Sequence, residues 1–588
     1  MNNNFPRILE GLSESQKNII TDTTNNLYVT ACPGSGKTRT LTRKIAYTSN
    51  LYYKSLKKII ALTYTKRAAN EIIDRLEKIG VTEDQIWVGT IHQFCLDFIL
   101  RKFGQNLERT SRGIKIIDEY ITDKYLKEGC KELNIKYNPY NPPNLKLDIK
   151  GNTEETNIEN IKLVNNYHKR LKDNNEIDFD LILTLSLKIL EENPVASTII
   201  SNNIRAVYVD EFQDTNEQQY KIISNLAKSD NTIKFLFMGD SDQAIFTSIG
   251  GVAKTKNELE KITGLSFISM ELNGCYRSTQ RIVNLYSQFQ QKNYKITSLA
   301  RYRNKPGVVK YDTHTHKDDL SNKISIIIQD LLNENIPEEE ICIIAPNQFL
   351  LAPITSDLKD RLPNVSFRSQ DVYPIKPDDL NIFYKMSFLV FTTSGQRVAL
   401  RKKIASEIID SLKRDYYVPL NEDFKGIDLL DKLNSIKSEE VNGLIYLHDK
   451  ITRLFIELEI KKEEFKNLFK QMSEFFTKTE ERINNTRLNL NTDIENFRNI
   501  YKTKKGINIS TIHKVKGEEY EVVIAFGFLE DIVPHFKSKN RTEESKKILY
   551  VAISRAKQRI YIFSERGRKN GNYPEKKPTK VLQAAEIL

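Results

Sequence analysis

The segment from Asn25 to Thr38 limits the fold of this chain more than any other. An apolar run, NNLYVTA, leads into the glycine-rich stretch CPGSGKT, and a long helical pattern follows it. A buried strand that passes through a short loop into a helix is the repeating unit of a parallel sheet covered by helices. The apolar runs KKIIALTYT, RAVYVDE and KFLFMGD repeat this pattern between Lys57 and Asp240. We therefore predict an α/β domain built on a parallel sheet.

The glycine-rich loop has the composition of a phosphate-binding loop. Glycines let backbone N–H groups close around phosphate oxygens, and the start of the following helix adds positive potential. Lys37 would reach the β- and γ-phosphates of a nucleotide, and Thr38 would bind Mg²⁺. The strict pattern has glycine at the position of Ala31, which is a small departure. The predicted nucleotide-binding loop comprises Ala31, Cys32, Pro33, Gly34, Ser35, Gly36, Lys37 and Thr38.

Two carboxylates follow a later strand, in the segment RAVYVDEFQDT. Asp210 and Glu211 would lie at the carboxyl end of that strand, where α/β sheets bind their ligands. One carboxylate, Asp210, can join Thr38 around Mg²⁺, while Glu211 polarises the attacking water. Together with the loop, these residues predict an enzyme that hydrolyses ATP with Mg²⁺. A GTPase or kinase is disfavoured, because no guanine-binding Asn-Lys-x-Asp segment is apparent.

The rest of the chain alternates between sheet-like and helical regions. The strand–helix rhythm fails between about 101 and 175, where Asn and Pro are abundant, and it resumes from 276 to 373 in PGVVKYDT and EEEICIIAP. Residues 374–505 are mainly helical and charged, and strands return at INISTIHKVKGEEYEVVIAFGF. We predict two parallel-sheet α/β domains, each interrupted by a mainly helical insert. The basic tail from Glu565 to Lys580 is expected to be loosely ordered.

Composition excludes several classes of protein. The 89 basic and 77 acidic residues give a net charge of +12, which suits a polyanionic partner but equally suits an ordinary solvated surface. The five cysteines are isolated, which argues against a disulfide scaffold or zinc knuckle and favours a reducing cytosol. No apolar run is long enough to span a bilayer. We expect a cytoplasmic protein without a membrane partner.

Across nearly its whole length the chain resembles the superfamily 1A DNA helicases of the UvrD/Rep/PcrA type. The matching segments, in chain order, are LSESQKNII, IIALTYTKRAANEIIDRL, GTIHQFC, IDFDLIL, VDEFQDTNEQQY, GDSDQAIF, CYRST, STIHKVKGEEYE and ILYVAISRAK. The resemblance implies two RecA-like P-loop NTPase domains. The first would comprise residues 1–100 and 176–275, the second 276–373 and 506–588, with helical inserts at 101–175 and 374–505.

The resemblance also implies roles around the nucleotide. Gln16, Arg39 and Tyr276 would hold the adenine, and Glu519 would hold the ribose. Gln243 in GDSDQ would sense the γ-phosphate and the attacking water.

Arg277 and Arg555 would act as arginine fingers that reach the γ-phosphate from the second domain. Planar guanidinium groups neutralise charge on a transferring phosphoryl group. Hydrolysis would then depend on closure of the cleft between the domains, which is how ATP turnover could produce movement.

A single-stranded DNA track is implied by matches at family positions that contact DNA. These positions are Thr63, Tyr64, Thr90, His92, Phe246, Thr511 and His513. A strand of DNA needs phosphate contacts and aromatic faces on which bases stack. Taken one at a time, the same aromatic residues would be ordinary core residues, and His92 an ordinary hydrogen-bonded histidine.

The chain departs from the family pattern at several of its motifs. After Phe246 the family has an aromatic residue, often Trp, and then Arg-Gly-Ala, whereas here the segment from Ser248 to Gly251 reads SIGG. Cys275 and Lys66 each stand where the family has Asn. One stacking platform and one cationic contact are therefore expected to be missing, and each lost stack weakens the grip on DNA by about 1–3 kcal/mol. Phe246 could compensate in part.

Two functions follow from these observations. The first is an ATP-dependent helicase or translocase that runs 3′ to 5′ on single-stranded and tailed duplex DNA. The alternative is a DNA-sensing ATPase subunit that switches on a partner nuclease and unwinds little, similar to the helicase subunits of anti-phage systems such as Gabija. The short inserts and the missing stack support the alternative, and the helicase or translocase is the leading hypothesis. The chain ends soon after Arg555, so we expect any nuclease to be a separate protein.

Overall fold

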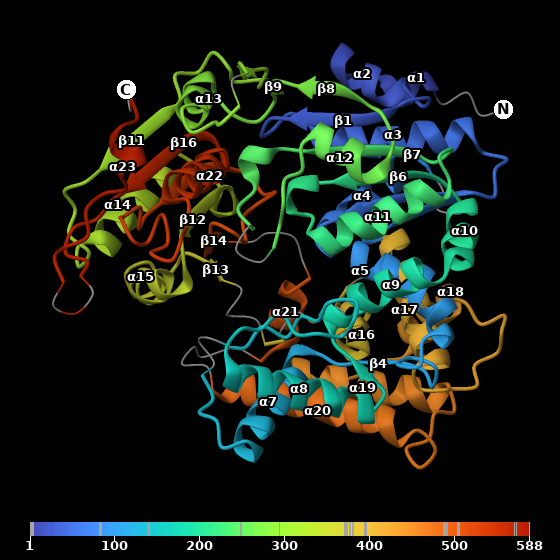
Figure 1. The fold of residues 1–588 in the computed structure, drawn as a ribbon. Helices are drawn as coiled ribbons and strands as arrows, with labels where there is room; N and C mark the ends of the chain where they lie inside the picture. The colour runs from blue at the N-terminus through green and yellow to red at the C-terminus, as the bar shows by residue number, and fades with distance from the viewer. Residues whose placement is uncertain are drawn as a thin grey trace.

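The computed structural model describes residues 5–81, 85–138, 142–246, 250–292, 294–369, 374–375, 378, 381–392, 397–485, 492–501, 506–569, 571 and 573–586. Two sheet domains lie side by side, the first at the upper right and the second at the left of Figure 1. The helices of the two inserts pack together below the first domain.

The first domain contains a six-stranded parallel sheet in the order β3-β2-β6-β7-β1-β8. Its strands are β1 (Asn26–Ala31), β2 (Lys58–Thr63), β3 (Ile86–Thr90), β6 (Ile204–Asp210), β7 (Lys234–Gly239) and β8 (Phe267–Leu272). Alternate residues of β1 enter different apolar clusters. Leu27 and Val29 pack with α3 (Lys37–Leu51) and α4 (Lys66–Lys78), whereas Tyr28 packs with α9 (Phe179–Glu192) and α11 (Glu217–Ser229). The sheet is therefore covered on both faces.

The second domain repeats this architecture with the strand order β11-β16-β15-β12-β14-β13, again all parallel. Its strands are β11 (Val308–Asp312), β12 (Ile341–Ala345), β13 (Phe367–Ser369), β14 (Ile507–Thr511), β15 (Tyr520–Ala525) and β16 (Ala556–Phe563). Helices α14 (Leu320–Asn333) and α15 (Gln348–Arg361) share one apolar cluster, and α13 (Gln280–Ser287) and α22 (Arg541–Ile553) share another. The prediction of two parallel-sheet α/β domains is confirmed.

The two inserts have different cores. The first contains α7 (Glu119–Glu132) and α8 (Ile158–Asp173), and Leu126 and Leu163 of these helices share an apolar cluster with Val207 of the first sheet. The second has a separate cluster formed by α16 (Ile382–Phe391), α17 (Val398–Arg414), α18 (Gly426–Ser435), α19 (Gly443–Glu457), α20 (Lys466–Asn485) and α21 (Ile494–Asn499). Because the core of the first insert merges with that of the first domain, the domain boundaries stay predictions.

Helix α4 shows how local sequence sets an element. Thr65 caps the helix, since its hydroxyl accepts a hydrogen bond from the Ala68 N–H at 3.2 Å. Ile72, Ile73 and Leu76 recur at helical spacing and are buried. The helix ends before Gly80, whose φ of +73° suits glycine.

The tail is more ordered than its composition predicts. Glu565 is fully buried, and its carboxylate accepts a hydrogen bond from the Gly527 N–H at 2.9 Å. Pro578 forms a β-bridge with Leu529, and Leu582 enters the core of the second domain. The expectation of a loosely ordered tail is wrong for its described residues. The tail is mostly charged, so its composition does not reveal the few residues that are buried against the second domain.

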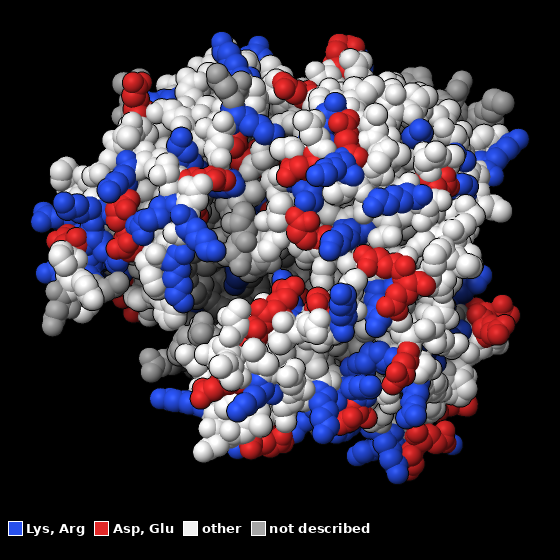
Figure 2. Space-filling model, viewed as in Figure 1, with Lys and Arg blue, Asp and Glu red and all other residues white. Residues whose placement is uncertain are grey.

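Surface charge is mixed on the face shown in Figure 2, where Lys and Arg side chains alternate with Asp and Glu. The excess of basic residues therefore forms no single positive field on that face. All five cysteines are buried and unpaired. Among the described residues, no helix is both long and apolar enough to cross a membrane.

Candidate nucleotide and single-strand sites

The phosphate loop joins β1 to α3 and leaves the start of that helix open. Gly36 occupies the cap position with a φ of +81°, and no side chain caps the helix. The first N–H groups of α3 can therefore bind an anion. The hydroxyl of Ser35 is buried within the loop and has no hydrogen-bond partner. An open helix start and an unsatisfied hydroxyl both fit a bound phosphate.

The arginine segment of the second domain packs directly against this loop. The Tyr276 N–H donates a hydrogen bond to the Gly34 carbonyl at 2.8 Å. A Cβ atom placed on Gly34 would lie 2.5 Å from the Cβ of Arg277, and the φ of Gly34 is +72°. Only glycine allows this approach.

We predict that Gly34→Ala both strains the loop and pushes Arg277 away from it. The positive φ alone is expected to lower the free energy of unfolding by about 1–2 kcal/mol. Gly80→Ala is a matched control, because Gly80 has nearly the same φ but no atom within 4 Å of an added Cβ. Thermal unfolding should show a loss of stability in both variants, larger in Gly34→Ala because of the added clash with Arg277, and ATP titration should show weaker binding only in Gly34→Ala. Equal ATP affinity in the two would contradict the close packing.

Two carboxylates face the loop lysine at the end of β6. The Lys37 ammonium lies 4.0 Å from the Glu211 carboxylate, and the Gln213 amide donates to Glu211 at 2.6 Å. Burial, together with the charge of Glu211, raises the pKa of Asp210 to about 7. Burial also acts to raise the pKa of Glu211, but the charges of Lys37 and Lys516 hold it below its usual value. Glu211 is therefore ionised at neutral pH, whereas Asp210 is poised to titrate.

Gln243 and Arg555 connect the two domains across the cleft. The Gln243 amide donates to Asp240 at 2.8 Å, and the Arg555 guanidinium donates to the Gln243 amide oxygen at 3.1 Å. Arg555 lies two residues after the end of α22 and also donates to the Val551 carbonyl at 3.0 Å. Burial, with the nearby charge of Arg277, lowers the pKa of Arg555 to about 9, so it keeps its charge at neutral pH.

The second arginine is held in the same region. Arg277 donates to the Glu519 carboxylate at 2.8 Å and to the Ser554 carbonyl at 2.9 Å. Tyr276 is 41% exposed, and Arg39 is exposed on α3. These residues are open to a nucleotide, and their base and ribose contacts stay predictions.

The structure shows contacts of Gln16 that its sequence motif does not predict. The side chain is buried, donates to the Ser35 carbonyl at 3.1 Å, and accepts from the Ser13 N–H at 3.1 Å. Both amide groups are thus engaged with the phosphate loop and with the cap of α2 (Glu14–Thr21). An adenine contact by Gln16, which stays a prediction, would require one of these bonds to be exchanged.

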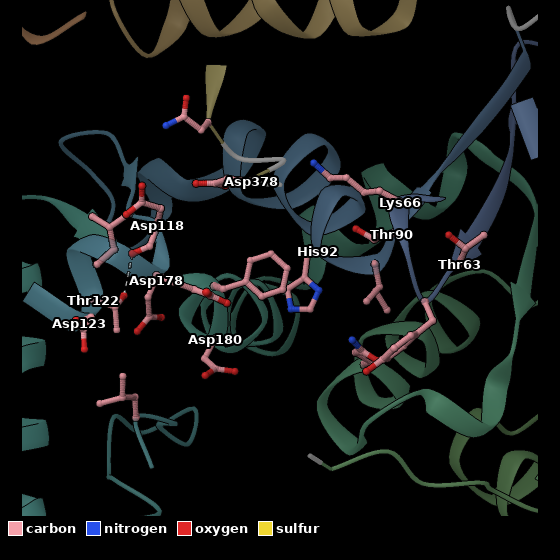
Figure 3. A pocket seen from close by; sticks show the side chains of 18 of the residues that line it. Thr63, Lys66, Thr90, His92, Asp118, Thr122, Asp123, Asp178, Asp180 and Asp378 are labelled. Carbon is pink, nitrogen blue, oxygen red and sulfur yellow. Dashed lines mark hydrogen bonds between the residues drawn. The ribbon is translucent and has the colours of Figure 1, made fainter. Parts of the chain in front are cut away.

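Four of the predicted DNA residues line a cavity of about 1300 Å³ between the first domain and both inserts. These are Thr63, Tyr64, Thr90 and His92. Figure 3 shows Thr63, Lys66 and Thr90 on one side of the cavity and Asp118, Asp178 and Asp180 on the other. Phe475 and Lys478 of α20 complete the lining from the second insert.

His92 forms a stacked pair at the middle of the cavity. Its ring stacks on that of Phe179, with 3.8 Å between the ring centroids and 23° between the ring planes. Burial lowers the pKa of His92 to about 3, so the imidazole is neutral. Phe179 is 47% exposed and offers its ring for stacking.

The other predicted DNA rings meet at the cleft. The rings of Tyr64 and Phe246 of the first domain stack with their centroids 5.0 Å apart. The centroid of the Phe246 ring lies 5.7 Å from that of the His513 ring of the second domain. Thr511 lies at the end of β14, two residues before His513. Ser248 and Ile249 lie outside the described residues, so the missing stacking platform stays a prediction.

Comparisons with known proteins agree with this geometry. Residues 12–262 match the model of the UvrD/REP helicase N-terminal domain, and residues 398–567 match that of the UvrD-like helicase C-terminal domain. The chain belongs to the UvrD/Rep/PcrA-like helicases of superfamily 1A. The ATP-dependent DNA helicase PcrA of Staphylococcus aureus is 25% identical over 641 aligned positions, which cover 97% of this chain and 86% of the relative. PcrA of Staphylococcus epidermidis is 26% identical with the same coverage.

This UvrD-like helicase is therefore an ATP-dependent DNA helicase, and the resemblance inferred from its motifs is confirmed. Its structure adds residues that sequence reasoning missed. Lys516 of the second domain pairs with Asp214 of the first at 2.6 Å and donates to the Gln243 carbonyl at 2.6 Å. Its ammonium also lies 5.1 Å from the centroid of the Phe246 ring.

A second ion pair crosses the same cleft of the helicase, between Arg67 and Glu518. Lys516 and Asp214 both lie inside recognised motifs, KVKGEE and DEFQD, but nothing in a motif tells which charges meet across a cleft. Phe179 likewise lies in IDFDLIL. The available signal was Asp178, a capping residue that places Phe179 at the first position of α9.

Proposed function

We propose that this UvrD-like helicase hydrolyses ATP with Mg²⁺ in the cleft between its sheet domains and thereby moves 3′ to 5′ along single-stranded DNA. The observation that carries the proposal is the hydrogen bond from Arg555 to Gln243. In this bond a cation of one domain contacts Gln243 of the other, the residue that we propose senses the γ-phosphate. The catalytic groups are then complete only when the cleft is closed, which links turnover to domain movement.

The residues present fit a nucleotide and its metal. Lys37, the open start of α3 and the Ser35 hydroxyl would hold phosphate oxygens. Thr38 and Asp210 would supply the hard oxygen ligands that Mg²⁺ prefers. When bound, Mg²⁺ would neutralise charge on the β- and γ-phosphates.

Glu211 is the proposed proton acceptor for the attacking water. Its carboxylate is ionised, and Lys37 and Gln213 fix its orientation. Gln243 is oriented by Asp240 and would position the water. Arg555 and Arg277 would donate to the γ-phosphate as its charge redistributes.

We predict that Mg²⁺ affinity depends on pH through Asp210. Below its pKa of about 7 the carboxyl is protonated, and a proton must leave before the oxygen binds metal. Apparent Mg²⁺ affinity at the protein–nucleotide complex should fall about tenfold for each pH unit below that value and level off above it. Calorimetric titration over a pH series measures this, and Asp210→Asn corrects for titration of the nucleotide. Equal pH dependence in both proteins would refute the prediction.

We predict that Lys516→Met destabilises the closed cleft. Asp214 is buried, and burial raises its pKa to about 6 even though Lys516 opposes the shift. Removing the lysine leaves this carboxylate without its partner, which should lower the free energy of unfolding by about 3–5 kcal/mol. Denaturant unfolding measures the loss, and adding Asp214→Asn should restore most of it. If the two substitutions lowered the free energy of unfolding additively, the result would argue against a direct interaction between Lys516 and Asp214.

Direction of movement is tested with tailed duplexes. A helicase that runs 3′ to 5′ should displace a strand from a duplex with a 3′ single-stranded tail and leave a 5′-tailed or blunt duplex intact. Preference for the 5′ tail would overturn the proposed polarity.

The acidic side of the cavity favours a second candidate function. Asp118, Asp178 and Asp180 would repel the phosphates of a strand drawn through the cavity (Figure 3). Lys478 of the second insert pairs with Asp118 at 3.3 Å and offsets only part of that charge. A DNA-sensing ATPase that switches a partner nuclease needs binding but little unwinding. Strong DNA-stimulated hydrolysis without displacement of a 3′-tailed duplex would favour it.

A further inference from the structure

One ion pair of the cleft takes no part in the proposed hydrolysis. It joins Arg67, the second residue of α4 in the first domain, to Glu518, which lies two residues before β15 of the second domain. The Arg67 side chain is 61% exposed, whereas that of Glu518 is only 7% exposed. A carboxylate is costly to bury unless it is paired and hydrogen-bonded, so the partners of Glu518 decide whether it can stay charged.

Within its own domain Glu518 is held by neutral donors. The side-chain amide of Asn508 on β14 donates to the carboxylate at 3.4 Å, and the Tyr520 hydroxyl donates to it as well. These groups orient the carboxylate without neutralising it. Arg67, the cation that pairs with it, comes from the other domain. Opening the cleft would therefore separate the pair and leave a buried carboxylate without this cation, which favours the closed form.

The chain at Glu518 contacts both proposed arginine fingers. The Glu518 carbonyl accepts a hydrogen bond from the Arg555 guanidinium at 3.3 Å. The carboxylate of the next residue, Glu519, accepts one from Arg277 at 2.8 Å. Because the two glutamates are adjacent, a shift of Glu518 would be transmitted to both arginines.

The other partner of the pair lies beside the predicted DNA residues. Arg67 follows Tyr64 by three residues, and the ring of Tyr64 stacks on that of Phe246 at the cleft. The ion pair thus connects the DNA side of the first domain to the part of the second domain that holds the fingers.

We infer that Glu518 is a positioning residue, which uses its ion pair with Arg67 to set the two arginine fingers when the cleft closes. The inference rests on the proposed function, in which Arg277 and Arg555 donate to the γ-phosphate. Closure brings Arg67 against the buried carboxylate, and the pair then fixes the short segment whose carbonyl and neighbouring carboxylate hold the fingers. Glu518 acts through the arginines and not on the phosphate itself.

The test is the binding of fluorescent ADP with and without aluminium fluoride, which stands in for the phosphoryl group during its transfer. The wild type should bind ADP more tightly with aluminium fluoride, because the fingers donate to the group that mimics the transition state. Arg67→Met and Glu518→Gln should each lose about tenfold of that gain and bind ADP alone normally. The double variant should lose no more than either single variant, because both substitutions break the same pair.

Two further variants serve as controls. Arg67→Lys keeps the charge and should retain most of the gain from aluminium fluoride. Lys78→Met removes a positive charge from the exposed last turn of the same helix, α4, and should change nothing.

Several results would overturn the inference. Glu518→Gln could keep the full gain from aluminium fluoride, or the losses of the two single variants could add in the double variant. A loss in Arg67→Met alone, together with weaker binding of fluorescein-labelled oligo(dT), would assign Arg67 to a DNA phosphate instead. Weaker binding of ADP alone by Glu518→Gln would show an effect on the fold and not on the fingers. If the wild type itself gained nothing from aluminium fluoride, the fingers would fail and the proposed function with them, whereas a gain that the variants share refutes the inference alone.

Discussion

ATP turnover in the presence of single-stranded DNA is expected to fall by about 10³–10⁵-fold when Arg555 is replaced by alanine. The guanidinium is buried against Gln243 in the cleft and is charged at neutral pH, because its pKa of about 9 is still well above neutrality. A planar cation in this place can donate to the γ-phosphate in the transition state, and alanine cannot. Steady-state hydrolysis measures the loss, while nucleotide binding should change little because the phosphate loop is intact.

Arg559→Ala is the matched control for this loss. Arg559 lies on β16 a short distance along the chain, where it pairs with Glu334 at 2.6 Å and away from the cleft. Because Arg555 is fully buried, thermal unfolding of the Arg555→Ala variant is measured to show that the variant is still folded. If Arg555→Ala turned over ATP as fast as Arg559→Ala, Arg555 would not be an arginine finger that acts on the γ-phosphate.

Glu211→Gln is expected to lower turnover by about 10²–10⁴-fold and to leave ATP and DNA binding in place. Glutamine has nearly the shape of glutamate and can keep the contact with Gln213, but it cannot accept the proton of the attacking water. Lys37→Ala should also abolish turnover, but through weaker nucleotide binding, because it removes the cation beside the phosphates. Equilibrium binding of a fluorescent nucleotide separates the two variants. Loss of nucleotide binding in Glu211→Gln would contradict its assignment as the base.

Features fixed by neighbouring residues could be predicted from the sequence. The strands β1, β2, β6 and β7 are short apolar runs, and burial on both faces of the sheet explains why those runs are continuous. The phosphate loop follows from its two glycines, both of which have the positive φ that the motif requires. Thr65 and Gly80 mark the ends of α4, where capping chemistry is local.

Features that depend on pairing across long distances could not be predicted. Lys516 was one lysine among many, and only the fold brings it to Asp214. The stack of Phe179 on His92 joins the start of α9 to the end of β3, and no periodicity reports such a contact. Gln16 was recognised in its motif, but its bond to the Ser35 carbonyl was not foreseen. In each case the sequence shows which residues can act, and the folded structure determines their partners.

The central claim is that hydrolysis in the cleft is coupled to DNA. The most direct measurement is the steady-state rate of ATP hydrolysis at saturating Mg²⁺ and ATP, with and without single-stranded oligo(dT). The proposal predicts a rate that rises strongly and saturates with added strand, because the rings proposed to contact the strand lie on both domains and Lys516 lies between Phe246 and Gln243. A rate that is the same with and without DNA would contradict the proposal that this chain is a motor driven by ATP along a single strand.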